Sequence, residues 1–289
     1  MTPHSSPATG NPGEAGRSGT PGRSGTPGRS GTPGIDVRRA GARFRTLEEG
    51  RLDSRHSFSF SQHFDPENTH FGLLLACNEE VLAPGAGFDT HPHRETEIVT
   101  WVLAGALAHE DSAGHRGELR PGQVQRMSAG SGVRHSERNA SAAEPVHYVQ
   151  MWLAPDVHGG EPGYEQREVG GRLESGGWTV LASGRPRDEG TGAIGLRQRG
   201  AALHAARLGP GGSLPLPAGA AYLHLLVVSG EVTLDGDGDG GGSGAVPLAA
   251  GDAVRIRRSP EGLGVTAAAS GGAELLAWEM DLDLRDLLG

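Results

Sequence analysis

The sequence predicts an all-β protein in which two groups of strands follow each other along the chain. Short apolar runs rich in β-branched residues, such as Ile98–Leu103, are typical of buried strands. Turn-forming sequences separate these runs, for example Asp111–Gly114 and Pro121–Gly122. The segment Val102–Leu107 is echoed by Val227–Val232, which indicates an internal duplication.

The first group of strands is predicted between residues 35 and 158. Phe58 and Phe60 alternate with serines, which predicts a half-buried strand. Cys77 is the only cysteine, so an internal disulfide cannot form, and its apolar neighbours predict a small buried core residue. The segments expected to form strands in this half are Ser57–Phe60, Phe71–Cys77, Ile98–Leu103, Ala106–Glu110, Val124–Met127 and Val146–Trp152.

The second group is predicted between residues 159 and 289, with a Pro- and Gly-containing linker at Pro155–Pro162. No His-x-His pair precedes Gly230 and no comparable pair follows Gly251, so this half is expected to lack metal ligands. His224 stands alone and is expected to be structural. The predicted strands are Trp178–Leu181, Ala201–Leu208, Tyr222–Val228, Glu231–Leu234, Val254–Ile256, Leu263–Ala267 and Leu275–Met280.

Two segments are of low complexity. Residues 1–34 include three copies of Arg-Ser-Gly-Thr-Pro-Gly and have almost nothing to bury, which predicts a disordered tail. The tail is either an inert extension or a weak tether or anion-binding arm. Asp235–Gly240 superficially resembles a Ca²⁺ loop. It lacks the bidentate glutamate such loops need, so a hairpin turn is expected there.

Four metal-capable side chains stand in two pairs with the spacing of one strand face. His91 and His93 form the first pair, and His135 and Glu137 form the second. If the two strands lie side by side, three imidazoles and one carboxylate converge on one point. This set suits Fe, Mn, Ni, Cu or Zn better than Ca or Mg. A structural zinc site is the alternative, although such sites are usually closed and rich in cysteine.

The same stretch is close to the two-part motif of cupins, which are small antiparallel β-barrels. In the first half, Gly85 stands six residues before the His-x-His pair and Glu97 stands four residues after it, whereas Gly105 comes one residue late. In the second half, Ser128 replaces the usual proline, and two extra residues precede His135.

These departures from the general cupin motif are found in one cupin family. Over roughly residues 36–185, the sequence resembles the pirins. The resemblance implies a bicupin, two antiparallel jelly-roll β-barrels packed in one chain, with one iron site in the N-terminal barrel. Carried over, the ligands are His91, His93, His135 and Glu137, and Glu97 is not a ligand. The similar segments are Leu52–Ser54, His56–Phe60, His91–Arg94, Met127–Gly130, Gly132–Glu137 and Tyr164–Arg167.

The resemblance implies two alternative functions. One is a quercetin 2,3-dioxygenase, which opens the ring of a small aromatic substrate such as a flavonol with O₂; Glu137 would then act as the catalytic base. The other is a redox-responsive regulator that binds a transcription factor or a metabolic enzyme. Either needs one divalent transition metal. Fe(II) is expected, and Mn, Ni, Cu, Co or Zn are alternatives.

Composition and the absence of long apolar segments limit the expected partners and location of the protein. The net charge is −9, which disfavours direct nucleic-acid binding. The sequence has neither an apolar signal region nor an apolar run long enough for a membrane, so a cytoplasmic location is expected. A monomer is expected as well.

Several residues outside the four-residue set have two open interpretations. His56 is either a hydrogen-bonded structural residue or a pocket residue, and His147 either orients a ligand or belongs to the core or a strand edge. His109 and His115 flank a turn and are expected in solvent. Pirins often carry tryptophan at the positions of Arg51 and Arg55, so substrate preference would differ if these residues line the pocket mouth.

Overall fold

The computed structural model describes residues 34–235 and 245–288 of the 289-residue chain. Most of the predicted tail and the glycine-rich turn after Asp235 lie outside these ranges. The described residues confirm the all-β expectation, because 22 strands form four sheets and every helix is short. The helices are α1 (Leu284–Leu288) and three 3₁₀ turns at Ala40–Ala42, Gly170–Ser175 and Pro186–Asp188.

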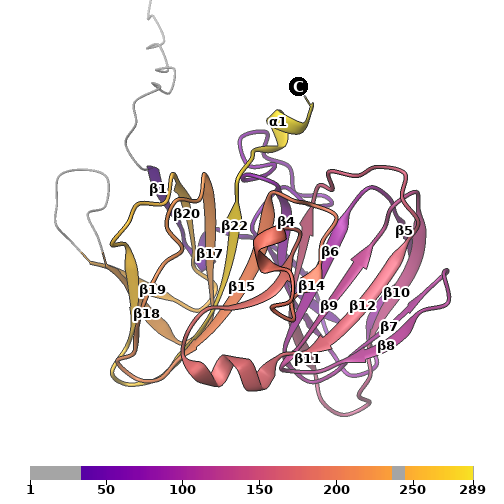
Figure 1. Ribbon diagram of the computed structural model, residues 1–289. Coiled ribbons are helices and arrows are strands. Elements are labelled where there is room, and N and C mark those ends of the chain that lie inside the picture. Colours follow the sequence, from indigo (N-terminus) through magenta and orange to yellow (C-terminus); the bar gives the residue numbers. More distant parts are fainter. Residues whose placement is uncertain (1–33, 236–244, 289) are drawn as a thin grey trace, which may run out of the picture. The chain divides into compact units, whose positions relative to one another are not determined.

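The first barrel consists of a seven-stranded and a four-stranded antiparallel sheet (Figure 1). Apolar side chains of both sheets fill its interior, including Leu82, Val102 and Leu107. In spatial order, the larger sheet contains β12 (Gly163–Glu168), β9 (Gln123–Ser128), β6 (Glu97–Ala104), β11 (Val146–Leu153), β4 (Leu74–Leu82), β3 (Leu52–His56) and β2 (Phe44–Glu48). The smaller contains β5 (Gly87–His93), β10 (Val133–Asn139), β7 (Leu107–Asp111) and β8 (Arg116–Leu119).

The second barrel also has a seven-stranded and a four-stranded sheet, antiparallel except for the parallel pair β13 and β14, and its interior is filled by residues such as Leu225, Val232 and Val265. Its larger sheet contains β1 (Gly34–Arg38), β20 (Ala253–Arg257), β17 (Tyr222–Ser229), β22 (Ala273–Met280), β15 (Ala201–Leu208), β13 (Thr179–Ser183) and β14 (Ile194–Gly195). Its smaller sheet contains β16 (Ser213–Pro215), β21 (Gly264–Ala267), β18 (Glu231–Asp235) and β19 (Val246–Ala249).

The largest buried cluster is shared by the two barrels. It joins Val99 and Trp101 of β6 to Leu203 of β15 and Trp278 of β22, all with no more than 1% of their surface exposed. β6 therefore has one face in this cluster and the other face in the first barrel. Burial on both faces explains why its sequence is a continuous apolar run rather than an alternating one.

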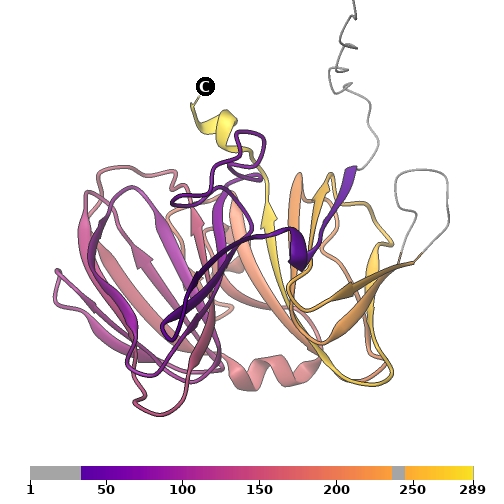
Figure 2. The same cartoon turned by 180° about the vertical axis from the view of Figure 1, so that it is seen from behind.

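Two strands cross between the barrels. β1 pairs with β20 of the second barrel, and β12 pairs with β9 of the first (Figures 1 and 2). Residues 35–38, which were expected in the first barrel, thus belong to a sheet of the second barrel. Residues 163–168, which follow the predicted linker, belong to a sheet of the first. The described residues form one compact unit, and the division at residues 158 and 159 stays a prediction.

Most predicted strands are confirmed, but the strand predicted at Ser57–Phe60 is wrong. β3 ends at His56, and the chain then enters a loop. Ser59 explains the change, because its backbone N–H donates to the Asn68 carbonyl and its hydroxyl bonds the backbone of Asp65. Such local side-chain bonds compete with a sheet ladder. Phe58 is nevertheless fully buried, as the alternation suggested.

Candidate metal centre and pocket

Three of the four predicted ligands come together in the first barrel. β5 and β10 pair antiparallel with His91 directly opposite His135, and His93 lies two residues further along β5. One ring nitrogen from each of the three histidines lies within 4.8 Å of the others. The ring centroids are 4.5–4.9 Å apart.

Glycines allow this close approach. A Cβ atom on Gly87, at the start of β5, would lie 2.3 Å from the carbonyl oxygen of Glu137, so only glycine lets β5 and β10 approach this closely here. Gly130, in the turn before β10, has φ +49°, and its Cβ would lie 2.1 Å from the carbonyl oxygen of Gly160. Both the left-handed conformation and the close contact favour glycine at that turn.

The free nitrogens of this group fit a transition metal. Nδ1 of His91 lies 2.7 Å from the carbonyl oxygen of Asp89, so it carries the proton and leaves Nε2 unprotonated. Nε2 of His93 and Nε2 of His135 are buried and have no hydrogen-bond partner among the described residues. Burial, and then the neighbouring histidines, lower the pKa of His93 and of His135 to about 3. The imidazoles of His93 and His135 are therefore neutral and offer lone pairs, which is the state that binds metal.

Glu137 is placed differently from the expectation. His135 and Glu137 lie on one buried face of β10, as predicted, because they pair in regular register with Asp111 and His109 of β7. The register shift is against β5, where an extra residue lies between Phe88 and His91. The carboxylate of Glu137 groups with His109 and His135 rather than with His91 and His93. Both of its oxygens accept from Nε2 of Gln150 at 2.9 Å. Its role as a ligand stays a prediction.

The Glu137 carboxylate belongs to a fixed chain of hydrogen bonds. Nε1 of Trp152 donates to Oε1 of Gln150 at 3.0 Å, which sets the amide so that its NH₂ points to Glu137. Burial raises the pKa of Glu137, and the bond from Gln150 opposes that rise. The Trp152 ring also packs edge-on against His93, at 4.8 Å between centroids.

A neighbouring network was missed by the sequence reasoning. His109, expected in solvent, is 3% exposed, and its Nδ1 lies 3.4 Å from Nδ1 of His135. Its Nε2 lies 3.4 Å from Asp111, which also accepts from Nδ1 of His115 at 2.9 Å. If Nε2 of His109 donates to Asp111, Nδ1 of His109 can accept from His135, which leaves Nε2 of His135 free. The inward alternation of Leu107, His109 and Asp111 was the available signal.

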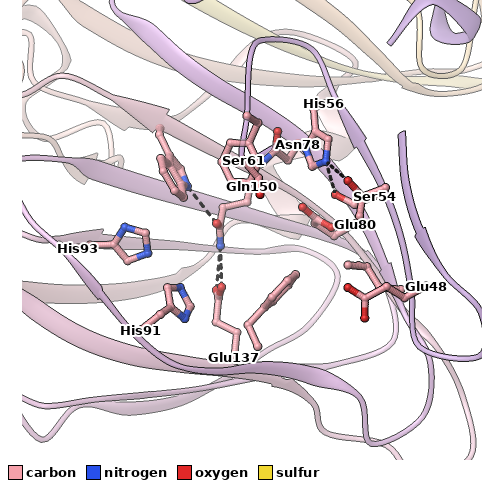
Figure 3. Close-up of a pocket in the computed structure, with 15 residues that line it drawn as sticks. Glu48, Ser54, His56, Ser61, Asn78, Glu80, His91, His93, Glu137 and Gln150 are labelled. Carbon is pink, nitrogen blue, oxygen red and sulfur yellow. Dashed lines mark hydrogen bonds between the residues drawn. The ribbon is translucent and has the colours of Figure 1, made fainter. Parts of the chain in front are cut away.

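A cavity of about 300 Å³ opens beside these histidines. This is at the lower end of the roughly 300–1,000 Å³ found for small-molecule sites. Figure 3 shows the histidines and Glu137 on one side and a polar wall on the other, formed by Ser54, His56, Asn78 and Glu80. Phe60, Phe88 and Trp152 supply flat apolar surface, and the remaining lining residues are Thr46, Glu48, Leu52, Ser61 and Gln150.

The positions of His56 and His147 show which of their two predicted roles each residue has. His56 both lines this cavity and bonds Thr46 at 3.1 Å, so its two interpretations are combined. Arg51 and Arg55 are not among the cavity-lining residues, and their effect on substrate preference stays a prediction. His147 bonds Glu79 at 2.9 Å rather than a ligand.

Two further expectations concern buried residues of the larger sheet. Cys77 is 1% exposed, and burial raises the pKa of its thiol to about 11, which confirms a core residue. Glu97 is buried away from the histidine group, and its carboxylate accepts from the backbone N–H of Arg197 at 3.1 Å.

Comparison with known proteins agrees with this geometry. The family model described as Pirin matches residues 37–153. A Mycobacterium tuberculosis protein named "Putative quercetin 2,3-dioxygenase Rv0181c" is 48% identical over 87% of this chain and 97% of its own length. An Escherichia coli protein named quercetin 2,3-dioxygenase is 44% identical over 46% of this chain and 57% of its own.

Solved structures give the same result. The crystal structure of the bacterial pirin YhhW of Escherichia coli in complex with nickel(II) covers 86% of this chain and 99% of that one, with 31% identity and a TM-score of 0.73. The fold is accordingly a bicupin, as the sequence indicated. The chain therefore belongs to the pirin family.

Proposed function

We propose that this protein is a quercetinase-type dioxygenase that opens flavonol rings with O₂, acting as a monomer in the cytoplasm. It would hold one divalent transition metal, Fe(II), through His91, His93, His135 and Glu137. The observation that carries the proposal is the group of three imidazoles with free nitrogens at one end of a cavity of about 300 Å³. Relatives named quercetin 2,3-dioxygenase support the choice of substrate.

A bound transition metal would supply Lewis acidity toward the oxygen atoms of the substrate and redox chemistry toward O₂. The residues of the chain supply orientation and proton transfer. Glu137 is the proposed base for the flavonol hydroxyl, since burial moves its pKa upward, toward neutral pH. Gln150 fixes the carboxylate orientation, because its Nε2 donates to both oxygens of Glu137.

The walls of the cavity match a flat, polyhydroxylated molecule. Phe60 and Trp152 pack edge to face, with ring centroids 5.2 Å apart, and give apolar surface for an aromatic ring. On the opposite wall, Oε2 of Glu80 and Oδ1 of Asn78 are buried without a partner among the described residues. Hydroxyl groups of a substrate could satisfy these oxygens.

The test compares oxygen consumption with a flavonol at equal metal occupancy. Glu137→Gln should keep most of the metal, because three imidazoles remain, and should lose on the order of 10²–10⁴-fold in turnover because the general base is gone. Glu110→Gln is the matched control, since this exposed carboxylate on β7 pairs with Arg116 outside the cavity.

Turnover of Glu137→Gln at the wild-type rate would remove Glu137 from the proposed chemistry. The redox-responsive regulator is the competing function. It would be supported if metal-loaded wild type turned over none of a panel of flavonols while a partner protein bound only one oxidation state of the metal.

A further inference from the structure

A second cavity, of about 200 Å³, lies where the two barrels meet. Its walls come from the loop after β3, from the segment before β2, and from β17 and β20 of the second barrel. It holds none of the proposed metal ligands, and His56 is the residue that it shares with the first cavity. The residues that matter below are Arg43, His56, Ser57, His224 and Arg255.

Arg255 is a buried cation without a counter-charge at contact distance. Its surface is 4% exposed, and its guanidinium lies over the Phe58 ring, 4.4 Å from the centroid. Its Nη2 donates to the carbonyl oxygen of Ser57 at 3.0 Å, while its Nε has no partner. Within the described ranges it forms no ion pair with a carboxylate. A guanidinium removed from water in this way is costly unless an anion accompanies it.

More unsatisfied groups line the same space. Nε of Arg43, Nδ1 of His56, Oγ of Ser57 and Nε2 of His224 are all buried and lack a hydrogen-bond partner among the described residues. The other two nitrogens of Arg43 are used, because they donate to Glu79 at 2.6 Å and to the carbonyl oxygen of Arg55 at 2.9 Å. Native proteins rarely leave so many buried polar atoms unpaired in one place.

The charges around the cavity are mostly positive. Arg38 and Arg39 also line it, and each is paired to a carboxylate, Asp36 and Asp252 respectively. Asp65 is the one acidic residue in the lining, and its Oδ1 accepts from the backbone N–H of Glu67 at 3.0 Å. None of these three carboxylates pairs with Arg255, whose positive charge therefore has no neutralising partner among the described residues.

We propose that this cavity binds a small oxyanion, of the phosphate or carboxylate class, through the guanidinium of Arg255 with support from Arg43, Ser57 and His224. A planar guanidinium presents several donors at once, which suits the paired oxygens of such an ion. The volume admits one small anion. An occupant would also contact His56, whose other nitrogen bonds Ser54 and Thr46 in the first cavity.

Calorimetric titration of metal-loaded protein with inorganic phosphate, sulfate and malonate tests the proposal, at constant ionic strength with chloride as reference. We expect saturable binding of one ion per chain to wild type and at least about tenfold weaker binding to Arg255→Gln, because the fork is lost. Arg257→Gln is the matched control, since this exposed arginine lies on the same strand but not among the lining residues. It should bind as wild type does.

Two additions distinguish an anion held at Arg255 from an anion bound to the metal and from a loss of folding. The double variant His91→Ala with His93→Ala should keep anion binding, which excludes binding to the metal. If Arg255→Gln does not fold, Arg255→Lys is titrated in its place. A wild-type crystal soaked with selenate locates the anion directly, since the anomalous selenium peak should lie within hydrogen-bond distance of Arg255. Binding no stronger than that of chloride, equal binding by Arg255→Gln, or selenate located only elsewhere would overturn the proposal.

Discussion

Two adjacent carboxylates of β4 should respond to neutralisation in opposite ways. The side chain of Glu80 lines the cavity beside the metal centre, where burial raises its pKa to about 8. The side chain of Glu79 points to the other face of the strand. Burial opposes ionisation there too, but bonds from His147 and Arg43 outweigh it and lower the pKa of Glu79 to about 2.

The sign for Glu80 follows from proton binding. Between pH 4.5 and about 8 the folded state binds the proton more tightly than the unfolded state, so stability falls as pH rises through this window. At about 1.36 kcal/mol per pH unit, the full displacement corresponds to on the order of 5 kcal/mol. Glu80→Gln removes this loss. The free energy of unfolding of the variant, compared with that of wild type, should therefore be higher at pH 8 than at pH 5 by a few kcal/mol.

The sign for Glu79 is the reverse. Its carboxylate stabilises the fold fully above pH 4.5, and that contribution is lost as pH falls toward 2. Glu79→Gln should therefore cost on the order of 3 kcal/mol at pH 8. This neighbour is the matched control, since it has the same chemistry and position in the chain but the opposite face.

Urea-induced unfolding of metal-free protein at several pH values between 5 and 8, followed by tryptophan fluorescence, measures both differences. Chelator in all samples keeps metal release out of the comparison. The reasoning would be refuted if Glu80→Gln lost stability at pH 8 as Glu79→Gln does, or if its difference from wild type did not change with pH.

Three further predictions concern the metal centre and its supporting turn. Elemental analysis should give one metal per chain for wild type and none for His91→Ala with His93→Ala; retained metal in the double variant would place the site elsewhere. His109→Leu should weaken metal binding about 10–100-fold in competition with a chelator while leaving the metal-free fold intact, because the partner that orients the imidazole of a neighbouring ligand is lost. Gly130→Ala should destabilise by about 1–3 kcal/mol in urea unfolding, because its φ is +49° and its Cβ would meet the carbonyl oxygen of Gly160, whereas Gly41→Ala, with open space, should be nearly neutral.

The sequence predicted those features that depend on local pattern. The His-x-His pair and His135 were found from the period of a strand. The pairing of β5 with β10 that brings them together was only a condition of the prediction, because β6 to β9 lie between these strands in the sequence. The seven strands predicted for the second half, such as Ala201–Leu208, were found with the bounds that the structure has or close to them, whereas β1, β14, β16 and β19 of the second barrel were not predicted. Each of these signals lies within a few residues of the feature that it marks.

Features that depend on distant neighbours were missed. Nothing near Gly34–Arg38 identifies β20 as its partner, and nothing near His109 separates a buried bond to His135 from exposure at a turn. The extra residue of β5 between Phe88 and His91 was also hidden, because a bulge reflects how two strands fit together. Burial and partner identity are set by tertiary structure, and a single sequence without aligned relatives carries little of that information.

The partner of β1 also has a consequence for the order of synthesis. Gly34 pairs with Arg257, so the first described strand leaves the ribosome 223 residues (257 − 34) before its neighbour exists. At about 5–20 residues per second, the delay is roughly 10 to 45 seconds. Throughout it, Ile35 and Val37, which later pack against the core of the second barrel, have no native sheet to join. A nascent chain of this protein therefore carries an unpaired strand segment with two apolar side chains, open to chaperones or to other unfinished chains, until translation is nearly complete.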